Sequence, residues 1–190
     1  MNLLEKEIVK RGVVLPGNVL KVGSFLNQRM DVALVSEMGK EIFNHYKSKG
    51  VTKVLTVEAS GIAIAFAAAI EFGVDMIFAK KSKTANVSGE LYKANCHSYT
   101  HNNDNTLTVP TEYISKEDKI LIVDDFLACG NAFYALKDIV KQSGAEIVGF
   151  SAAIEKGFQG GGDKLREEGY DVFSLAIVES MEDGKITFRK

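Results

Sequence analysis

The sequence predicts an α/β protein built on an open, mostly parallel twisted sheet with helices on both faces. Short apolar segments alternate with longer helix-like ones along the 190 residues, the pattern of strands joined by crossover helices. Residues 120–123, Ile-Leu-Ile-Val, form an apolar run without polar alternation, as expected of a strand buried on both faces. The sequence has no internal repeat and no linker-like segment, so one domain is expected.

The elements can be placed in chain order. Asp31 can serve as the N-cap of a helix that Gly50 closes, and Gly73 ends the next helix. The predicted helices are residues 3–10, 32–49, 62–72, 133–142 and 163–168. The predicted strands are residues 53–57, 74–79, 107–109, 120–123, 146–154, 172–177 and 185–188. Residues 80 to about 105 are polar without periodicity and predict an unstructured segment, which is unusual inside a domain.

The composition excludes several classes of function. With 46% hydrophobic and 25% charged residues it is that of an ordinary globular protein, and the net charge of −2 gives no electrostatic footprint for nucleic acid. Cys96 and Cys129 match neither a metal spacing nor a disulfide framework. The N-terminus lacks signal-peptide features, and the longest apolar stretch, residues 62–70, is too short to span a membrane. We therefore expect a soluble cytoplasmic protein without nucleic-acid or membrane partners.

Residues 119–132 carry the strongest functional signal. The apolar strand ends in two adjacent carboxylates, Asp124 and Asp125, and small residues then lead into a helix. Ligands of open α/β sheets bind beyond the carboxyl ends of strands, and backbone N–H groups at the start of a helix suit a phosphate. Acids beside such a loop indicate a ribose phosphate. Response regulators, methyltransferases and other nucleotide-binding proteins share the bare pattern, and acids at a strand end can also merely cap a turn.

Residues 123–132, Val-Asp-Asp-Phe-Leu-Ala-Cys-Gly-Asn-Ala, resemble the phosphoribosyl-diphosphate signature of the type I phosphoribosyltransferases. Cys129 stands where that pattern usually has Ser or Thr. Three further segments extend the resemblance over essentially the whole chain to the bacterial members that use xanthine: residues 20–28, 57–62 and 154–159. The resemblance implies a single phosphoribosyltransferase domain over residues 1–190, in which residues 1–30 contribute to a hood over the base pocket.

The resemblance also implies a reaction, in which the 5-phosphoribosyl group moves from phosphoribosyl diphosphate to N9 of xanthine. Mg²⁺ would be bound mainly through phosphoribosyl diphosphate, no residue is assigned as a metal ligand, and the enzyme would be a homodimer. Positive charge develops on the ribose as diphosphate leaves, which makes Asp124 and Asp125 the candidate catalytic residues. The 5′-phosphate loop would consist of Ala128, Cys129, Gly130, Asn131 and Ala132. The diphosphate would contact Ser60, Gly61 and Lys81. Xanthine would contact Leu20, Asn27 and Lys156.

Some of these residues also have a purely structural interpretation. Ser60 could be the N-cap of an ordinary turn. A group of lysines could be a solvated charge run rather than part of an active-site lid: Lys80, Lys81 and Lys83. His97 and His101 lack the further ligands that a metal site would need.

The choice of base depends on Lys156. An ammonium group only donates hydrogen bonds, so Lys156 can reach the 6-oxo group or N7 of a purine but cannot bond adenine's amine. Asn27 can donate to the 2-oxo group of xanthine but can also turn its amide over. Two alternative functions are a guanine or hypoxanthine phosphoribosyltransferase, and a non-catalytic regulator that senses phosphoribosyl diphosphate.

Overall fold

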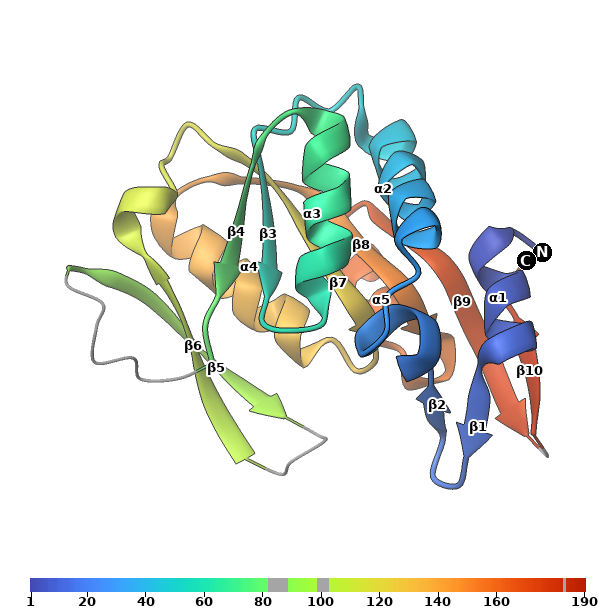
Figure 1. The fold of residues 1–190 in the computed structure, drawn as a ribbon. Helices are drawn as coiled ribbons and strands as arrows, with labels where there is room; N and C mark the ends of the chain where they lie inside the picture. The colour runs from blue at the N-terminus through green and yellow to red at the C-terminus, as the bar shows by residue number, and fades with distance from the viewer. Residues whose placement is uncertain (82–88, 99–102, 183) are drawn as a thin grey trace.

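A twisted six-stranded sheet forms the centre of the computed structural model, which describes residues 1–81, 89–98, 103–182 and 184–190 (Figure 1). Its parallel strands are β3 (Lys53–Val57), β4 (Asp75–Ala79), β7 (Lys119–Leu127), β8 (Glu146–Lys156) and β9 (Val172–Glu182). β10 (Lys185–Phe188) joins the edge in antiparallel direction. The order across the sheet is β10-β9-β8-β7-β3-β4. The predicted open, mostly parallel sheet is therefore confirmed.

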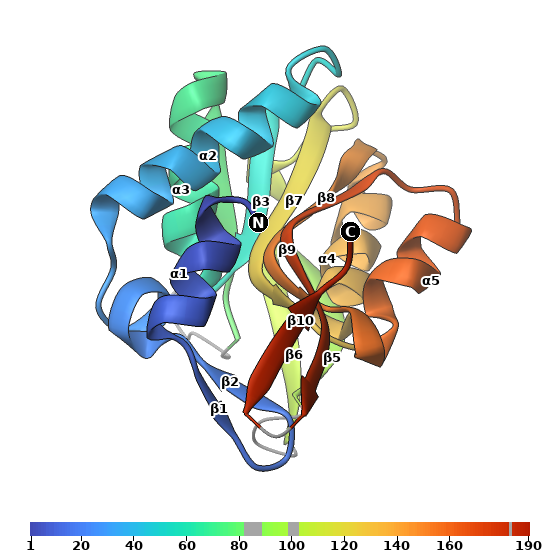
Figure 2. The same ribbon diagram turned by 90° about the vertical axis from the view of Figure 1, so that its right-hand side faces the viewer.

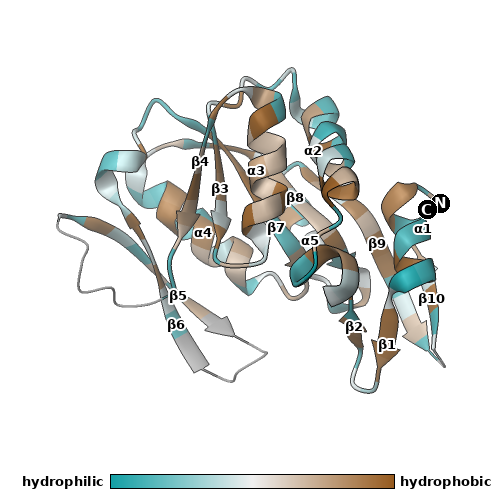
Figure 3. Cartoon of the chain, viewed as in Figure 1, coloured by the Kyte–Doolittle hydropathy of each residue, from teal (hydrophilic) through white to brown (hydrophobic). Residues whose placement is uncertain are grey.

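Helices cover both faces of this sheet. α1 (Leu3–Arg11), α2 (Val32–Tyr46) and α3 (Gly61–Phe72) lie on one face, and α4 (Asn131–Ser143) and α5 (Gly161–Glu167) lie on the other (Figure 2). One buried apolar cluster, which includes Phe25 and Ile42, fills the space under α1, α2 and α3. A second cluster, which includes Phe133 and Phe150, lies under α4. The strands and α3 are apolar along most of their length, whereas α2 carries polar residues on its outer side (Figure 3).

Local sequence signals set the ends of several helices. α1 begins with a capping box, in which the Glu5 backbone N–H donates to Asn2 Oδ1 and the Asn2 N–H donates to Glu5 Oε2, both at 2.9 Å. α2 begins after Asp31 as predicted, with Leu34 N donating to the Asp31 carboxylate at 3.2 Å. α3 ends at Gly73, whose left-handed φ of 67° is typical of a helix C-terminus.

Two antiparallel hairpins flank the edge of the sheet at which the parallel strands end (Figure 1). The first pairs β1 (Val13–Leu15) with β2 (Val19–Lys21) and is followed by a π-helical turn, η1 (Gly23–Asn27). The second pairs β5 (Leu91–Ser98) with β6 (Asn103–Pro110) and is followed by η2 (Thr111–Tyr113). A third short turn, η3 (Gly157–Gln159), follows β8 at the same edge.

The prediction of an unstructured segment from residue 80 to about 105 is wrong for its described part. In the β5–β6 hairpin Ala94 pairs with Leu107 and Tyr92 pairs with Val109, and Ala94, Leu107 and Val109 are buried. The apolar residues therefore alternate with period two, but long polar residues between them hide this signal. Lys83 and His101 lie outside the described residues, as do the side-chain contacts of His97.

Candidate active site

β7 extends further than the predicted strand, which was expected to end at Val123. Its pairing with β3 stops at Ile122, whereas its pairing with β8 continues to Leu127. Asp124 and Asp125 therefore lie inside the strand, at the place where β3 has separated from β7. The chain passes from β3 toward β4 on one side and from β7 toward β8 on the other. This is the switch point of the sheet, at which ligands of such folds bind.

Both carboxylates are buried, with 5% of Asp124 and 7% of Asp125 exposed. Asp124 Oδ1 accepts a hydrogen bond from the Asp125 backbone N–H at 2.9 Å. Burial raises the pKa of Asp124 well above its usual value, and the charge of Asp125 raises this pKa further, while Lys81 acts in the opposite direction. Two acids with little water around them thus share a site in which negative charge is costly unless a cation faces it.

The predicted 5′-phosphate loop joins β7 to α4. Residues Ala128, Cys129, Gly130, Asn131 and Ala132 all line a pocket of about 190 Å³ that also contains Asp124 and Asp125. Gly130 precedes α4 with a left-handed φ of 92°, a conformation that favours glycine. Because α4 has 13 residues and begins at the pocket, its first backbone N–H groups and its positive dipole end are available to an anion.

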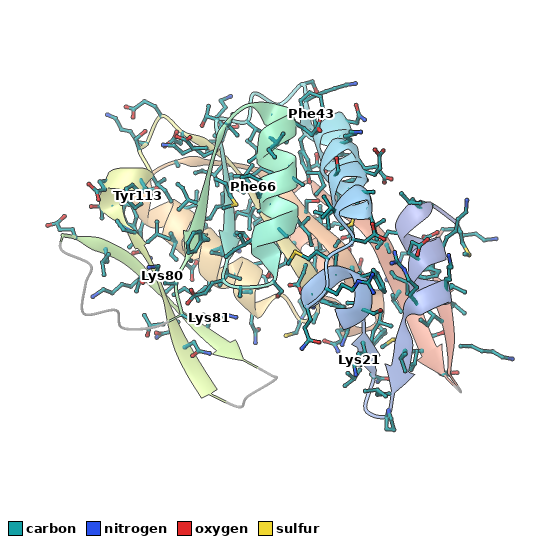
Figure 4. All side chains as sticks on the ribbon, viewed as in Figure 1. Lys21, Phe43, Phe66, Lys80, Lys81 and Tyr113 are labelled. Atoms are coloured by element: carbon teal, nitrogen blue, oxygen red, sulfur yellow. The ribbon has the colours of Figure 1, made fainter. Side chains whose placement is uncertain are left out.

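Two of the three predicted diphosphate residues line the same pocket, and Gly61 does not. Ser60 and Lys81 line it, and the backbone N–H of Lys81 donates to Glu58 Oε1 at 2.6 Å. Lys81 directly follows the point at which Lys80 bridges to Thr108 of β6 (Figure 4). The peptide bond between Glu58 and Ala59 is cis. Ser60 occupies the N-cap position of α3, as its structural interpretation expected, but its side chain makes no capping hydrogen bond.

Gly61 begins α3 directly against the acidic pair. A Cβ atom at this position would collide with Asp124 Oδ1 and Thr56 Oγ1. Thr56 is fully buried, and its hydroxyl has no hydrogen-bond partner among the described residues. Gly61 therefore allows the start of α3 to approach the acids as closely as backbone permits.

The three predicted purine residues do not line this pocket, and each belongs to or contacts the N-terminal segment of residues 1–30. Asn27 Nδ2 donates to Asp125 Oδ2 at 3.0 Å, which joins η1 to the acidic pair. Lys156 Nζ donates to the carbonyl oxygen of Asn18 in the β1–β2 turn at 3.0 Å. Burial lowers the pKa of Lys156. Leu20 is only 6% exposed and belongs to the core cluster under α1, so most of its surface is packed within that cluster.

Sequence reasoning missed several residues of the pocket wall. Glu58 adds a carboxylate, and Cys96 and Asn105 enter from the β5–β6 hairpin. Burial raises the pKa of the Cys96 thiol. The alternation of Tyr92, Ala94 and Cys96 is the signal that could have placed this hairpin over the pocket. A larger hollow of about 710 Å³ lies along β4 and η2, and none of the predicted site residues lines it.

Two absences concern only the described residues. No group of three or more His, Cys, Asp or Glu side chains there could hold a metal ion. No helix in the described ranges is long and apolar enough to cross a membrane.

Known proteins resemble this chain in both sequence and fold. The family model described as phosphoribosyl transferase domain matches residues 22–185, which include both acids and both loops. The chain therefore belongs to the phosphoribosyl transferase family. Solved structures agree on the fold: adenine phosphoribosyltransferase from Giardia lamblia in complex with 9-deazaadenine has a TM-score of 0.75 at 20% identity, covering 90% of this chain and 95% of that one.

Within this family the similar full-length relatives are xanthine phosphoribosyltransferases. The enzyme of Ruminiclostridium cellulolyticum is 50% identical over 188 residues, which cover 99% of both chains. The enzyme of Bifidobacterium adolescentis is 49% identical over 192 aligned residues, covering 100% of both. The enzyme of Bacillus mycoides is 45% identical, covering 99% of this chain and 95% of the relative. The chain thus matches these enzymes from end to end, including residues 1–30.

Proposed function

We propose that this protein transfers the 5-phosphoribosyl group of phosphoribosyl diphosphate to N9 of xanthine, giving xanthosine 5′-monophosphate and diphosphate for purine salvage. The observation that carries the proposal is one pocket that contains paired buried acids, a glycine loop at a helix start and a lysine. Full-length relatives at 45–50% identity that are named xanthine phosphoribosyltransferases support the choice of base.

In this reaction Asp124 and Asp125 accept hydrogen bonds from the ribose hydroxyls and place negative charge beside the sugar. As the bond from C1 to diphosphate breaks, the ribose becomes an oxocarbenium ion, which these carboxylates stabilise more than they stabilise the uncharged ribose ring of the substrate. The raised pKa of Asp124 falls as cationic charge approaches, and Lys81 supplies such charge in the pocket. The 5′-phosphate lies on the amides of residues 128–132, so the sugar is held between loop and acids.

The pocket residues fit Mg²⁺ bound mainly through phosphoribosyl diphosphate. Mg²⁺ prefers oxygen ligands and commonly takes one or two carboxylates together with substrate phosphates. Asp124, Asp125 and Glu58 all line the pocket, and one or two of these carboxylates would supply oxygens beside the substrate phosphates. When bound, the ion neutralises charge on the departing diphosphate.

Xanthine is placed between the hood and the ends of β7 and β8. The half-buried Lys156 ammonium donates to N7 or to the 6-oxo group, and its position 5.8 Å from the Phe126 ring centre fits a base lying over that ring. The Asn27 amide has two hydrogens, so one can remain on Asp125 while the other reaches the 2-oxo oxygen. Residues 1–30 act in this scheme as a hood, with Leu20 supplying apolar support beneath the base.

The protein acts as a homodimer in the cytoplasm. α3 is apolar on its outer side as well as its inner one, with Phe66 57% and Ile70 61% exposed (Figure 4), and an exposed apolar patch of this kind is typical of a protein interface. The described cysteines, Cys96 and Cys129, are both free, which suits a reducing compartment. Sedimentation of the parent and of Phe66→Glu tests the dimer, because a charge on this face should yield monomers.

One assay tests the main proposal. The protein is mixed with Mg²⁺, phosphoribosyl diphosphate and each purine in turn, and the nucleotide formed is identified. We expect xanthosine 5′-monophosphate from xanthine, poorer conversion of guanine and hypoxanthine, and none of adenine. Preferential use of guanine would contradict the assigned base, and comparable use of adenine would contradict the role of Lys156. Tight binding of phosphoribosyl diphosphate without any nucleotide product would indicate a regulator instead.

A further inference from the structure

The glycine run Gly160-Gly161-Gly162 packs against the back of the phosphate loop. The Gly161 backbone N–H donates to the Ala128 carbonyl oxygen at 3.1 Å. A Cβ atom on Gly161 would lie 2.6 Å from the carbonyl carbon of Cys129 and 2.7 Å from the backbone nitrogen of Gly130. Contacts this short do not occur for a real Cβ, so backbone must touch backbone here. The close backbone contact at the start of α5 therefore limits where the phosphate loop can lie.

A buried carboxylate holds α5 in this place. Glu155 is fully buried on β8, and the Arg166 guanidinium of α5 binds it with both nitrogens, at 2.8 Å to Oε1 and 2.7 Å to Oε2. Ser174 of β9 donates to the same carboxylate at 2.5 Å. Gly162 lies so close that a Cβ there would collide with the Glu155 carboxyl group. The position of α5 beside the loop therefore depends on contacts with the Glu155 side chain.

The anchoring continues to Arg189, the residue that follows β10. Arg166 Nη1 also donates to Asp163 Oδ1 at 3.0 Å, and Asp163 accepts from Arg189 Nη1 at 2.6 Å. The Glu155 carboxylate raises the pKa of the Arg166 guanidinium. The network leaves little freedom for α5 to move away from the loop.

We propose that Glu155 is a positioning residue for the reaction. It fixes Arg166 and α5, and thereby Gly161, so that the amides of the phosphate loop are held ready for the 5′-phosphate. A buried ion pair contributes little net stability compared with an apolar substitute, so stability alone does not account for a charged pair here. Glu155 also directly precedes Lys156 on β8, so the end of this strand positions the proposed purine lysine relative to the phosphate loop.

Three variants test the inference. Glu155→Gln keeps the side-chain shape but removes the charge that binds Arg166, Arg166→Lys keeps a cation without the two-pronged geometry, and Gly161→Ala pushes a methyl group into the loop. Mutating the outer-shell partners of metal ligands typically costs roughly 10- to 100-fold in affinity or activity, and we take the lower end of this scale for a residue that supports a phosphate loop. We expect KM and the calorimetric Kd for phosphoribosyl diphosphate to rise about 10-fold in each variant, with kcat at saturation reduced by less than about 3-fold.

A matched control is Asp118→Asn, another buried carboxylate held by a lysine and a hydroxyl. Asp118 accepts from Lys53 Nζ at 2.8 Å and from Thr52 Oγ1 at 3.1 Å. It is buried and directly precedes β7, at the end of that strand away from the acidic pair. This variant should lose thermal stability but keep the parent Kd for phosphoribosyl diphosphate. Folded Glu155→Gln and Gly161→Ala proteins with the parent Kd would overturn the inference. If Glu155→Gln does not fold, Gly161→Ala and Arg166→Lys decide the matter in the same way.

The inference rests on the proposed function for the identity of its ligand, but the two fail differently. A parent protein that binds phosphoribosyl diphosphate without forming a nucleotide would overturn the proposed reaction while the Kd comparison still tests the positioning role. An active parent whose three variants keep the parent Kd and KM would overturn the positioning role alone.

Discussion

The paired acids should have opposite effects on catalysis and on stability, and the double variant Asp124→Asn/Asp125→Asn separates the two. Asparagine keeps the shape of each side chain and the oxygen that accepts the backbone N–H of residue 125, but it removes the charge beside the developing oxocarbenium ion. Losing one preorganised electrostatic group costs roughly 10²- to 10³-fold in kcat. We expect kcat to fall on the order of 10³-fold or more, and KM for phosphoribosyl diphosphate to change far less.

The same variant should be more stable than the parent at neutral and alkaline pH. Burial, with the charge of Asp125, raises the pKa of Asp124, whereas an unfolded Asp has a pKa of about 3.9. The native state therefore binds more protons between these two values, and stability falls as pH rises through the native pKa. Removing the free-energy cost of ionising Asp124 in the native state should stabilise the protein by about 0.5–2 kcal/mol. This corresponds to roughly 1–8 °C in Tm for a chain of this size.

Steady-state kinetics with xanthine and thermal melts across the pH range test both parts. The Tm advantage of the variant should be largest at alkaline pH and should shrink as pH falls toward about 4. Asp118→Asn is the control, because the pKa of Asp118 is lowered by Lys53 even though burial acts to raise it, so its loss should destabilise. A folded double variant with near-parent kcat would refute the catalytic role. A lower Tm at alkaline pH would refute the reasoning about charge.

Further variants probe the remaining walls of the pocket. Gly130→Val should weaken calorimetric binding of phosphoribosyl diphosphate at least about 10-fold, because valine cannot adopt the left-handed φ and would crowd Tyr134; a folded variant with parent affinity would disprove the phosphate-loop assignment. Cys129→Ser should bind within about 2-fold of the parent, since it only exchanges a weak donor for a stronger one. Lys156→Met should raise KM for xanthine roughly 10-fold through one lost hydrogen bond, without changing the Kd of phosphoribosyl diphosphate; an unchanged KM would remove Lys156 from the base site. Gly61→Ala should lower both Tm and kcat, as its methyl group meets Asp124 and Thr56, and a variant with parent melts and kinetics would contradict that packing.

The sheet could be predicted because its strands carry strong local signals. Residues 53–57 match β3 without error, and the apolar run at 120–123 lies within β7. The acids could be found because they stand next to a buried apolar run. A carboxylate is rarely buried in such a place unless it has a partner or a function. The end of β7 was misplaced because its last residues pair with β8 alone, and strand pairing of this kind leaves no mark in local sequence.

Other features depend on contacts between residues far apart in the chain. The β5–β6 hairpin was missed because half of each strand is polar and faces away from the core. Glu155 gives no local sign of its role, since its partners Arg166 and Ser174 lie 11 and 19 residues further along the chain. The hydrogen bond of Asn27 to Asp125 spans 98 residues and could be inferred only once the hood was folded over the sheet.

The two chain ends lie next to each other, with α1 packed beside β9 and β10 (Figures 1 and 2). Asn2 donates its side-chain N–H to the Leu175 carbonyl of β9, so the first helix is anchored to nearly the last strand. During synthesis residues 1–30 leave the ribosome first, whereas β9, against which α1 packs, is made near the end. The N-terminal residues can therefore reach their final packing only after the strand that carries the acidic pair and the phosphate loop that follows it have been made. On the proposed function, the purine side of the site is then the last part of the site to be completed.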